Sequence, residues 1–427
     1  MTKLIKLESE KPILEKIIVV KVLQSKWFGD LLKIRDHLKH QKHIKCENIT
    51  LDKENMEVLI TGSGLYTPAE TISNDELVES YNTYVDNYNL ENDEAIKSGQ
   101  SKALVHSDSE FIKKVSGIEQ RFVLDKEGIL DPARMRPNLK ARSNEEISVQ
   151  AEIAVDACKQ AMENAGRSAK DIDAVICGCA NLQRAYPAVS IEIQDALNIE
   201  GYAYDMNVAC SSSTFAIQNA YNDIQSGVAE RILVVNPDIC SAHLNFKDRD
   251  GHFIFGDACT SVLLERKDDK PNSKAFEILG TRLKTKFSNN IRNNFGFLNK
   301  PENSDSENPD KLFIQNGRKV YKDVVPMVEE HIKAHLEELN LTVPEVTRLW
   351  LHQANLNMNE SISKRILGRD PSEKEMPIVL DEYANTSSAG SIIAFHKNNS
   401  DINSGEVGVI CSFGAGYSVG SVVVRKL

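Results

Sequence analysis

Hydrophobic and polar positions along this chain form a pattern that occurs twice. Residues 149–164 place apolar side chains at helical spacing and end before Gly166, a residue that suits a left-handed helix cap. An apolar strand is predicted at residues 174–181. In the second half, residues 320–339 repeat the helical spacing and residues 348–355 repeat the strand. Both predicted strands end in Ala-Asn, which indicates an internal repeat.

The match continues downstream of both strands. Residues 204–210 precede a helix that ends in Ser-Gly, and residues 380–385 precede another helix with the same ending. Strands that alternate with helices are typical of parallel sheets covered by helices, so we predict an α/β protein. A duplicated unit favours two stacked sheets related by a pseudo-twofold axis. In this alignment Asn385 takes the place of Cys210.

The sequence divides into an N-terminal extension and two halves. The extension carries 12 Lys and Arg against 8 Asp and Glu, and we expect either an amphipathic helix within residues 16–43 or a solvated appendage. A strand that begins after Met56 opens the fold. The predicted domains are residues 1–55, 56–272 and 273–427. Two polar insertions are predicted to be surface loops or excursions over a pocket: residues 81–102 and 124–142.

Composition narrows the classes of function. The chain has 427 residues and a formal net charge of −11, which disfavours binding to nucleic acid. No apolar stretch is long enough to span a bilayer, so we expect no membrane insertion. The eight cysteines are scattered rather than set at disulfide or zinc-finger spacing. This usage favours a reducing cytoplasm and no metal site.

Three polar residues lie at the ends of predicted strands. We call the strand-to-helix turn in each copy of the repeat an elbow and expect functional residues there. Cys210 comes between a strand and a helix, and the free amides and dipole of a helix N-terminus would stabilise its nucleophilic thiolate. His352 ends a strand, where α/β folds place their sites. Asn385 follows at the second elbow. Taken singly, these residues also suit structural roles as a packing thiol, a structural histidine and a helix N-cap.

Glycines follow the last apolar strand, in the segment 413–420. They let the backbone pass close to another group. One of the amides here, together with the amide of Cys210, could form an oxyanion hole for a tetrahedral intermediate. A simple turn between two strands explains the segment equally well.

Four motifs then occur in a fixed order between Met56 and Leu427. They are Asp205-Met206-Asn207-Val208-Ala209-Cys210-Ser211-Ser212, His352-Gln353-Ala354-Asn355, Asn385-Thr386-Ser387-Ser388-Ala389 and Phe413-Gly414-Ala415-Gly416. With these motifs the chain resembles the β-ketoacyl-acyl-carrier-protein synthase III group of the thiolase superfamily. The resemblance implies a thiolase-like fold of two duplicated halves in αβαβα layers, and a Cys–His–Asn site.

The resemblance also implies a decarboxylative Claisen condensation in two steps. Cys210 would take an acyl group from a thioester primer. Malonyl-acyl-carrier-protein would then lose CO₂ while His352 and Asn385, both uncharged donors, bond to its thioester oxygen. The resulting carbanion would attack acyl-Cys210. The product is a β-ketoacyl thioester, which starts fatty-acid synthesis.

Further contacts are implied by the same resemblance. The oxyanion loop would be Gly414, Ala415 and Gly416, and the substrate-binding positions would be Phe111, Tyr186, Arg249, Asn355 and Phe413. An acidic carrier protein would dock on Arg318 and Lys322. The resemblance implies a homodimer and no cofactor, since the substrates arrive as CoA or phosphopantetheine thioesters. Val115 stands where the family often has an arginine that grips CoA, so we expect an unusual primer.

Other functions compete with this interpretation. A cysteine peptidase is excluded because its Cys-Gly-Ser-Cys-Trp signature is absent. A thiolase would use a second cysteine, but Cys411 is offset by one residue, which in a strand points it to the opposite face. A thiolase-fold acyltransferase, or a specialised-metabolite condensing enzyme without the malonyl partner, stays open as the alternative. A non-catalytic scaffold leaves the three polar residues unexplained.

Overall fold

The computed structural model describes residues 2–5, 18–21, 56–268, 274–302 and 308–427. The chain divides into two units, Met1–Asn55 and Met56–Leu427. In the first unit, β1 (Thr2–Ile5) pairs antiparallel with β2 (Ile18–Lys21). Residues 18–21 are therefore a strand, not part of the helix considered for residues 16–43. The rest of that segment lies outside the described residues.

A mixed sheet of nine strands runs through the second unit, in the order β13-β14-β15-β10-β3-β9-β8-β6-β7. The first half supplies β3 (Val58–Tyr66), β6 (Ala174–Gly178), β7 (Tyr202–Met206), β8 (Arg231–Ile239) and β9 (Asp257–Arg266). The second half supplies β10 (Phe276–Ser288), β13 (Val346–Leu351), β14 (Val407–Gly414) and β15 (Gly416–Lys426). Parallel pairs are β6 with β7, β6 with β8, and β13 with β14, whereas the other ladders are antiparallel.

The two halves of the sheet join through a short ladder. Only Phe276 with Ile60 and Glu277 with Leu59 pair between β10 and β3. The second half repeats the strand order of the first but has no equivalent of the edge strand β7. A short helix, α11 (Leu380–Tyr383), occupies that place in the chain. The predicted duplication is therefore present, with one strand fewer in the second copy.

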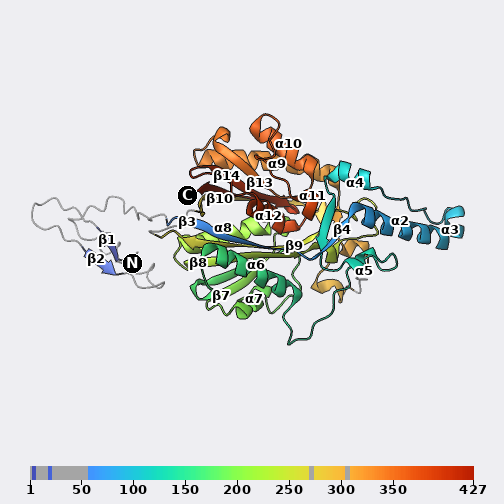
Figure 1. Cartoon of the computed structure of the whole chain (residues 1–427), viewed down its shortest axis with the longest axis horizontal. Coiled ribbons are helices and arrows are strands. Elements are labelled where there is room, and N and C mark those ends of the chain that lie inside the picture. Colours follow the sequence, from blue (N-terminus) through green and yellow to red (C-terminus); the bar gives the residue numbers. More distant parts are fainter. Residues whose placement is uncertain (1, 6–17, 22–55, 269–273, 303–307) are drawn as a thin grey trace, which may run out of the picture. The chain divides into compact units, whose positions relative to one another are not determined.

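Helices complete five layers (Figure 1). α8 (Ser212–Gln225) and α12 (Gly390–Lys397) lie between the two halves, because one buried cluster unites Ala216 and Ile393 with strand residues of both, such as Ile176 and Val422. The outer helices of the first half are α6 (Val149–Ala165) and α7 (Val189–Leu197), and those of the second are α9 (Gly317–Glu338) and α10 (Leu356–Leu367). The predicted α/β class and αβαβα layering are confirmed, but the two predicted sheets are joined through the β10–β3 ladder into one sheet.

The two elbows share a backbone conformation, but the residues that correspond to each other differ from those predicted. Asn207 Oδ1 accepts a hydrogen bond from the amide of Ala209, and Asn385 Oδ1 accepts one from the amide of Ser387, both at 2.8 Å. Ala209 and Ser387 share a positive φ, 46° and 51°. Asn385 is therefore the counterpart of Asn207. The predicted equivalence of Asn385 with Cys210 was wrong, because the sequence repeat does not reveal which residue makes the turn.

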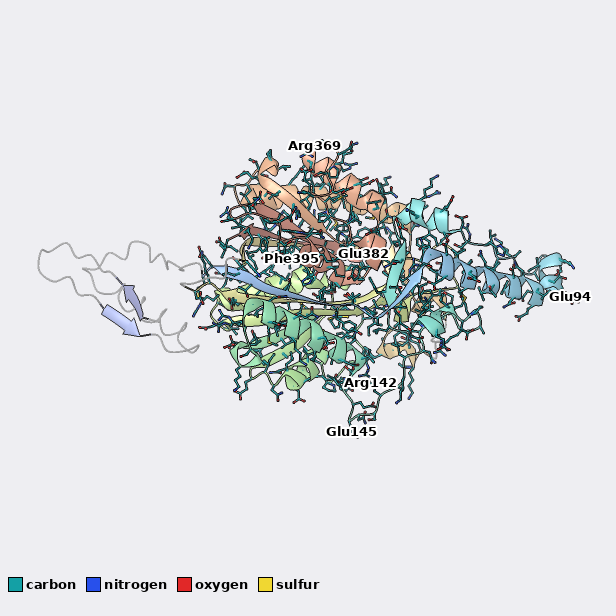
Figure 2. All side chains as sticks on the ribbon, viewed as in Figure 1. Glu94, Arg142, Glu145, Arg369, Glu382 and Phe395 are labelled. Carbon is teal, nitrogen blue, oxygen red and sulfur yellow. The ribbon has the colours of Figure 1, made fainter. Side chains whose placement is uncertain are left out.

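The first insertion, predicted as a surface loop or an excursion over a pocket, is mostly helical. α2 (Asn74–Glu91) begins at a capping box formed by Ser73 and Glu76, and its buried face includes Leu77, Tyr81 and Val85. α3 (Asp93–Lys97) follows, and Figure 2 shows Glu94 at the far end of this arm. The polar surface of α2 hides a narrow apolar stripe, which explains why the segment looked featureless.

Smaller elements complete the second unit. They are α4 (Ser109–Ser116) and α5 (Lys126–Leu130), the pair β4 (Glu70–Ser73) with β5 (Gln120–Val123), and the pair β11 (Ile291–Arg292) with β12 (Ile314–Gln315). The second insertion thus contains α5 and ends at Arg142 without further regular structure, and Figure 2 shows Glu145 just beyond it on the protruding loop. Within the described ranges, we find no helix with the length and apolarity needed to cross a membrane.

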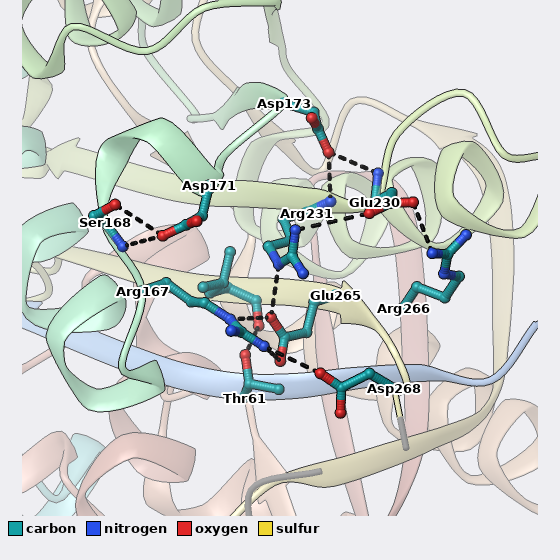
Figure 3. A network of polar contacts seen from close by, with 11 residues as sticks. Thr61, Arg167, Ser168, Asp171, Asp173, Glu230, Arg231, Glu265, Arg266 and Asp268 are labelled. Carbon is teal, nitrogen blue, oxygen red and sulfur yellow. Dashed lines mark hydrogen bonds and ion pairs between the residues drawn. The ribbon is translucent and has the colours of Figure 1, made fainter. Parts of the chain in front are cut away.

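An ion-pair network ties the first half together at the edge remote from the helical arm (Figure 3). Glu265 at the end of β9 is 5% exposed and bonds to Arg167 after α6, with Oε2 2.9 Å from Nε. The same carboxylate lies 3.3 Å from Nε of Arg231 at the start of β8. One buried charge therefore joins a helix and two strands.

Replacing Glu265 by Gln should lower the free energy of unfolding by about 3 kcal/mol, because two arginines lose their buried partner. Urea denaturation followed by circular dichroism measures this change. The matched control is Glu230→Gln in the same network. Glu230 pairs with Arg266 at a half-exposed surface, so we expect a loss below about 1 kcal/mol. Equal effects of the two substitutions would contradict the assignment.

Candidate active site

Cys210 lies where the two halves of the second unit meet. It belongs to the short helical turn η2 (Ala209–Ser211), directly before α8. The end of β14 passes beside it, so closely that a Cβ added to Gly414 would lie 2.7 Å from Cys210 Cβ and 3.0 Å from Sγ. Only glycine fits at position 414 without displacing the thiol.

Burial controls the protonation of this thiol. It raises the pKa of Cys210 to about 11, and the nearby Asp238 carboxylate adds to the increase. Hydrogen bonds from the Ser387 hydroxyl and from the amides of Ala415 and Cys210 act in the opposite direction. Desolvation therefore acts against the thiolate stabilisation expected at a helix N-terminus and favours the neutral form of the Cys210 thiol.

His352 follows β13 and is 2% exposed. Its backbone amide donates to the carbonyl of Cys411 at 2.8 Å, and its ring meets Phe413 edge to face at 5.3 Å. Burial lowers the pKa of His352 to about 4. The imidazole is therefore neutral at physiological pH and can donate one hydrogen bond without carrying a charge.

The side chain of Asn385 is oriented by its own turn. Its Oδ1 accepts from the amide of Ser387, which leaves Nδ2 without a hydrogen-bond partner among the described residues. The backbone is fixed as well, because the amide of Asn385 donates to Ile254 and its carbonyl accepts from Gly256. A preorganised N–H donor therefore points away from the turn.

A cavity of about 670 Å³ brings these groups together. Cys210, His352 and Asn385 all line it. The remaining wall is mainly apolar and includes Val115, Ile118, Phe253, Ile254, Phe313, Val324 and Met358. A thiol and two neutral donors in the wall of a mainly apolar cavity suit chemistry on an acyl thioester.

The other predicted site residues divide into two groups. Asn355, Phe413, Gly414 and Arg318 also line the cavity. The side chain of Asn355 is already engaged, however: Nδ2 donates to the carbonyl of Val115 at 2.7 Å and Oδ1 caps α10 at the amide of Met358.

The remaining predicted residues lie outside the cavity lining: Phe111, Tyr186, Arg249, Lys322, Ala415 and Gly416. Arg249 stacks on the ring of Phe111 at 5.3 Å, and its Nε donates to the carbonyl of His106. The ring of Tyr186 is 85% exposed. Lys322 lies on the same helix as Arg318, one turn further along α9.

Two residues of the site escaped the sequence analysis. Ser387, inside a motif already noted, donates its hydroxyl to Cys210 Sγ at 3.7 Å. Asp238 is 1% exposed and accepts from the amides of Ser388 and Ala180, so it anchors the second elbow to the first half. An acidic residue within an otherwise apolar strand was the available signal for Asp238. No group of His, Cys, Asp and Glu suited to a metal occurs in the described part of the chain.

Comparisons with known proteins agree with this geometry. The family model for 3-oxoacyl-[acyl-carrier-protein] synthase III matches residues 204–286, and the model for its C-terminal part matches residues 336–426. The β-ketodecanoyl-[acyl-carrier-protein] synthase of Pseudomonas aeruginosa is 60% identical over 349 residues, which cover 82% of this chain and all of that protein. The β-ketoacyl-[acyl-carrier-protein] synthase III of Clostridium perfringens is 26% identical and covers 87% of this chain and 99% of its own.

A solved structure shares the fold. The 3-oxoacyl-[acyl-carrier-protein] synthase III of Aquifex aeolicus superposes with a TM-score of 0.67 at 23% identity, over 86% of this chain and 99% of its own. The chain belongs to the 3-oxoacyl-[acyl-carrier-protein] synthase III family. It is an acyl-transferring condensing enzyme, which joins an acyl primer to malonyl-acyl-carrier-protein in fatty-acid synthesis.

The raised pKa of Cys210 makes a prediction about its reactivity. The rate of alkylation by iodoacetamide should rise tenfold per pH unit and keep rising above pH about 8.5, where an ordinary cysteine levels off. Mass spectrometry of the peptide that carries Cys210 measures the rate, with Cys210→Ala as the control for other thiols. A plateau below pH about 8 would mean that a thiolate is stabilised after all.

Proposed function

We propose that this chain condenses an eight-carbon acyl thioester with malonyl-acyl-carrier-protein to give β-ketodecanoyl-acyl-carrier-protein. The observation that carries the primer length is the 60% identity, over its full length, with a β-ketodecanoyl synthase. The product acyl group of that relative has ten carbons. Malonyl contributes two after it loses CO₂, so the primer contributes eight.

Acylation of Cys210 is the first step of the proposed mechanism. The thiol attacks the primer carbonyl, the carbon–sulfur bond to CoA or phosphopantetheine breaks, and the departing sulfur receives the proton. The amides of Cys210 and Ala415 approach the cysteine sulfur. They are therefore placed to bond to the carbonyl oxygen as negative charge develops on it. In this assignment Gly414 and Gly416 serve the loop by letting the backbone come close.

Decarboxylation is the second step. Malonyl-acyl-carrier-protein enters the same cavity, and its thioester oxygen accepts hydrogen bonds from His352 and from Nδ2 of Asn385. These donors stabilise the enolate that forms as CO₂ leaves, at about 3 kcal/mol for each one. The carbanion then attacks the carbonyl of acyl-Cys210. The carbon–sulfur bond to Cys210 breaks, the released thiolate takes up a proton from water, and the β-ketoacyl thioester leaves.

The character of the cavity supports a medium-chain primer. Each buried methylene contributes about 0.8 kcal/mol, so the six extra methylenes of octanoyl over acetyl contribute about 5 kcal/mol when they leave water. The wall offers apolar side chains for this contact. Val115, in the place of an arginine that often grips CoA in the family, is one of them. Phe413 and the backbone around Asn355 would contact the thioester arm.

Phe111 and Arg249 belong to the proposed primer entrance. Their side chains stack on each other. To accommodate the adenine of a CoA primer, the two side chains would have to separate, or the adenine would have to bind on the outer side of the stacked pair. The proposal therefore includes both acyl-CoA and acyl-carrier-protein as donors, and no cofactor beyond the carrier of the thioester.

The carrier protein is proposed to dock beside Arg318 and Lys322. Arg318 lines the cavity, and neither side chain has an ion-pair partner in the described part of the chain. The chain as a whole carries a net charge of −11, so unpaired cations beside the opening are a local exception. Such a spot suits an acidic carrier protein that delivers a phosphopantetheine arm.

We also propose a homodimer in the cytoplasm. β7 is the edge strand of the first half, with a neighbour on one side only. The exposed side chains of Tyr186 and Ile191 lie in and just before α7, the helix that packs against β7. A second copy that pairs along this edge would cover all three features. The seven cysteines of the described ranges are free thiols, in keeping with a reducing compartment.

The primer prediction can be tested by intact-mass analysis. The protein is mixed with a series of acyl-CoAs from acetyl to dodecanoyl, and in parallel with the matching acyl-carrier-proteins. Octanoyl should load most completely, because its chain matches the product of the 60% identical relative. Cys210→Ala should stay unmodified. Preferential loading of acetyl would overturn the primer length, and labelling of Cys210→Ala would overturn the nucleophile.

Substitutions can distinguish the role of the two neutral donors from that of the nucleophile. His352→Ala and Asn385→Ala should each lower the release of ¹⁴CO₂ from labelled malonyl-acyl-carrier-protein by a factor of about 100 or more. Loading of Cys210 by the primer should persist in both variants. Cys210→Ala provides the reverse control, since it should still release CO₂. Equal loss of loading and decarboxylation in the donor variants would contradict the assigned roles.

A further inference from the structure

Ser387 contacts all three proposed catalytic residues. Its hydroxyl donates to Cys210 Sγ at 3.7 Å, and its amide donates to Asn385 Oδ1 at 2.8 Å. Its backbone also approaches the ring of His352. The residue is 2% exposed. Ser387 is therefore a buried residue that lies between the proposed nucleophile and the two proposed donors.

The thiol needs a donor at this position. Burial raises the pKa of Cys210, and among the groups that act against this increase the Ser387 hydroxyl has the largest effect. His352 is neutral, so it supplies no positive charge to the sulfur. A hydroxyl that donates to a thiolate stabilises the charged form without itself becoming charged.

The duplicated fold shows that the hydroxyl is not required by the backbone. Ala209 holds the equivalent place in the first elbow, with φ of 46° against 51° for Ser387. Its amide makes the same hydrogen bond, to Asn207 Oδ1. An alanine therefore adopts this left-handed turn in the same fold. What serine adds at position 387 is the hydroxyl, and that hydroxyl points at the reacting sulfur.

We propose that Ser387 is a further catalytic residue, which donates a hydrogen bond to Cys210 Sγ as the thiol loses its proton and attacks the primer. This inference rests on the proposed role of Cys210 as the acyl acceptor. Overall, the S–H bond of Cys210 and the carbon–sulfur bond of the primer break. A new thioester forms on Cys210, and the proton leaves on the released thiol. Ser387 keeps its own proton throughout.

The proposal separates the two half-reactions. Within the described residues, the hydrogen bond of the hydroxyl is to the sulfur of Cys210, whereas the link to Asn385 runs through the amide of Ser387. Removal of the hydroxyl should therefore slow primer loading and leave decarboxylation of malonyl-acyl-carrier-protein at the wild-type rate. A residue that only supports the fold would affect both steps.

The test compares Ser387→Ala with Ser391→Ala. Ser391 is also fully buried, but its hydroxyl bonds to Ser412 instead of the sulfur, at 2.7 Å. For Ser387→Ala we expect the pH profile of Cys210 alkylation to move up by about one unit. Octanoyl loading at neutral pH should slow by about threefold to tenfold. A higher pKa lowers the fraction of thiolate about tenfold, but the thiolate that forms is a stronger nucleophile, which offsets part of the loss. Ser391→Ala should keep the wild-type profile.

Each outcome has one meaning. If wild-type protein loads octanoyl on Cys210 and the profiles of Ser387→Ala and wild type coincide, the role of Ser387 is refuted while the proposed function stands. If the wild type does not load at all, the proposed function fails first. Should Ser387→Ala not fold, Ser387→Gly tolerates the same positive φ, lacks the same hydroxyl and must give the same shift.

Discussion

The contact between Gly414 and Cys210 is the constraint on which the site depends. It brings the end of a strand from the second half against the nucleophile of the first, at a spacing that admits no side chain. The same approach carries the amide of Ala415 to the sulfur. Because α8 and α12 share one core between the halves, this geometry is held by the packing of the whole second unit. Catalytic groups from both halves can then meet in one cavity.

Burial at this junction determines how the chemistry proceeds. It favours the neutral forms of Cys210 and His352 alike, which moves their pKa values in opposite directions. The proposed mechanism therefore uses hydrogen bonds rather than fixed charges. In that mechanism, amides and the Ser387 hydroxyl act on the acyl-transfer side, whereas His352 and Asn385 act on the malonyl side. Neutral donors suit a reaction in which negative charge appears first on one thioester oxygen and then on another.

The family was predicted from the resemblance carried by four motifs. The sequence repeat allowed the α/β class and the duplication to be predicted, because its strands and helices recur in the same order. It could not fix the register of the elbows, since the turn is made by Ala209 and Ser387, whose residue types do not signal a positive φ. It also missed the helix α2, whose apolar stripe is narrow. The burial that raises the pKa of Cys210 could not be predicted, because a helix N-terminus is visible in the sequence, whereas the depth of burial depends on tertiary packing.

A crystal structure of the octanoyl-loaded protein would test the central claim, that two separate sets of neutral donors serve the two half-reactions. We expect density for an eight-carbon chain continuous with Cys210 Sγ. The acyl oxygen should face the amides of Cys210 and Ala415, and Nδ2 of Asn385 should stay free for malonyl. An acyl oxygen bonded to His352 or Asn385, or an acyl group on another residue, would contradict the account.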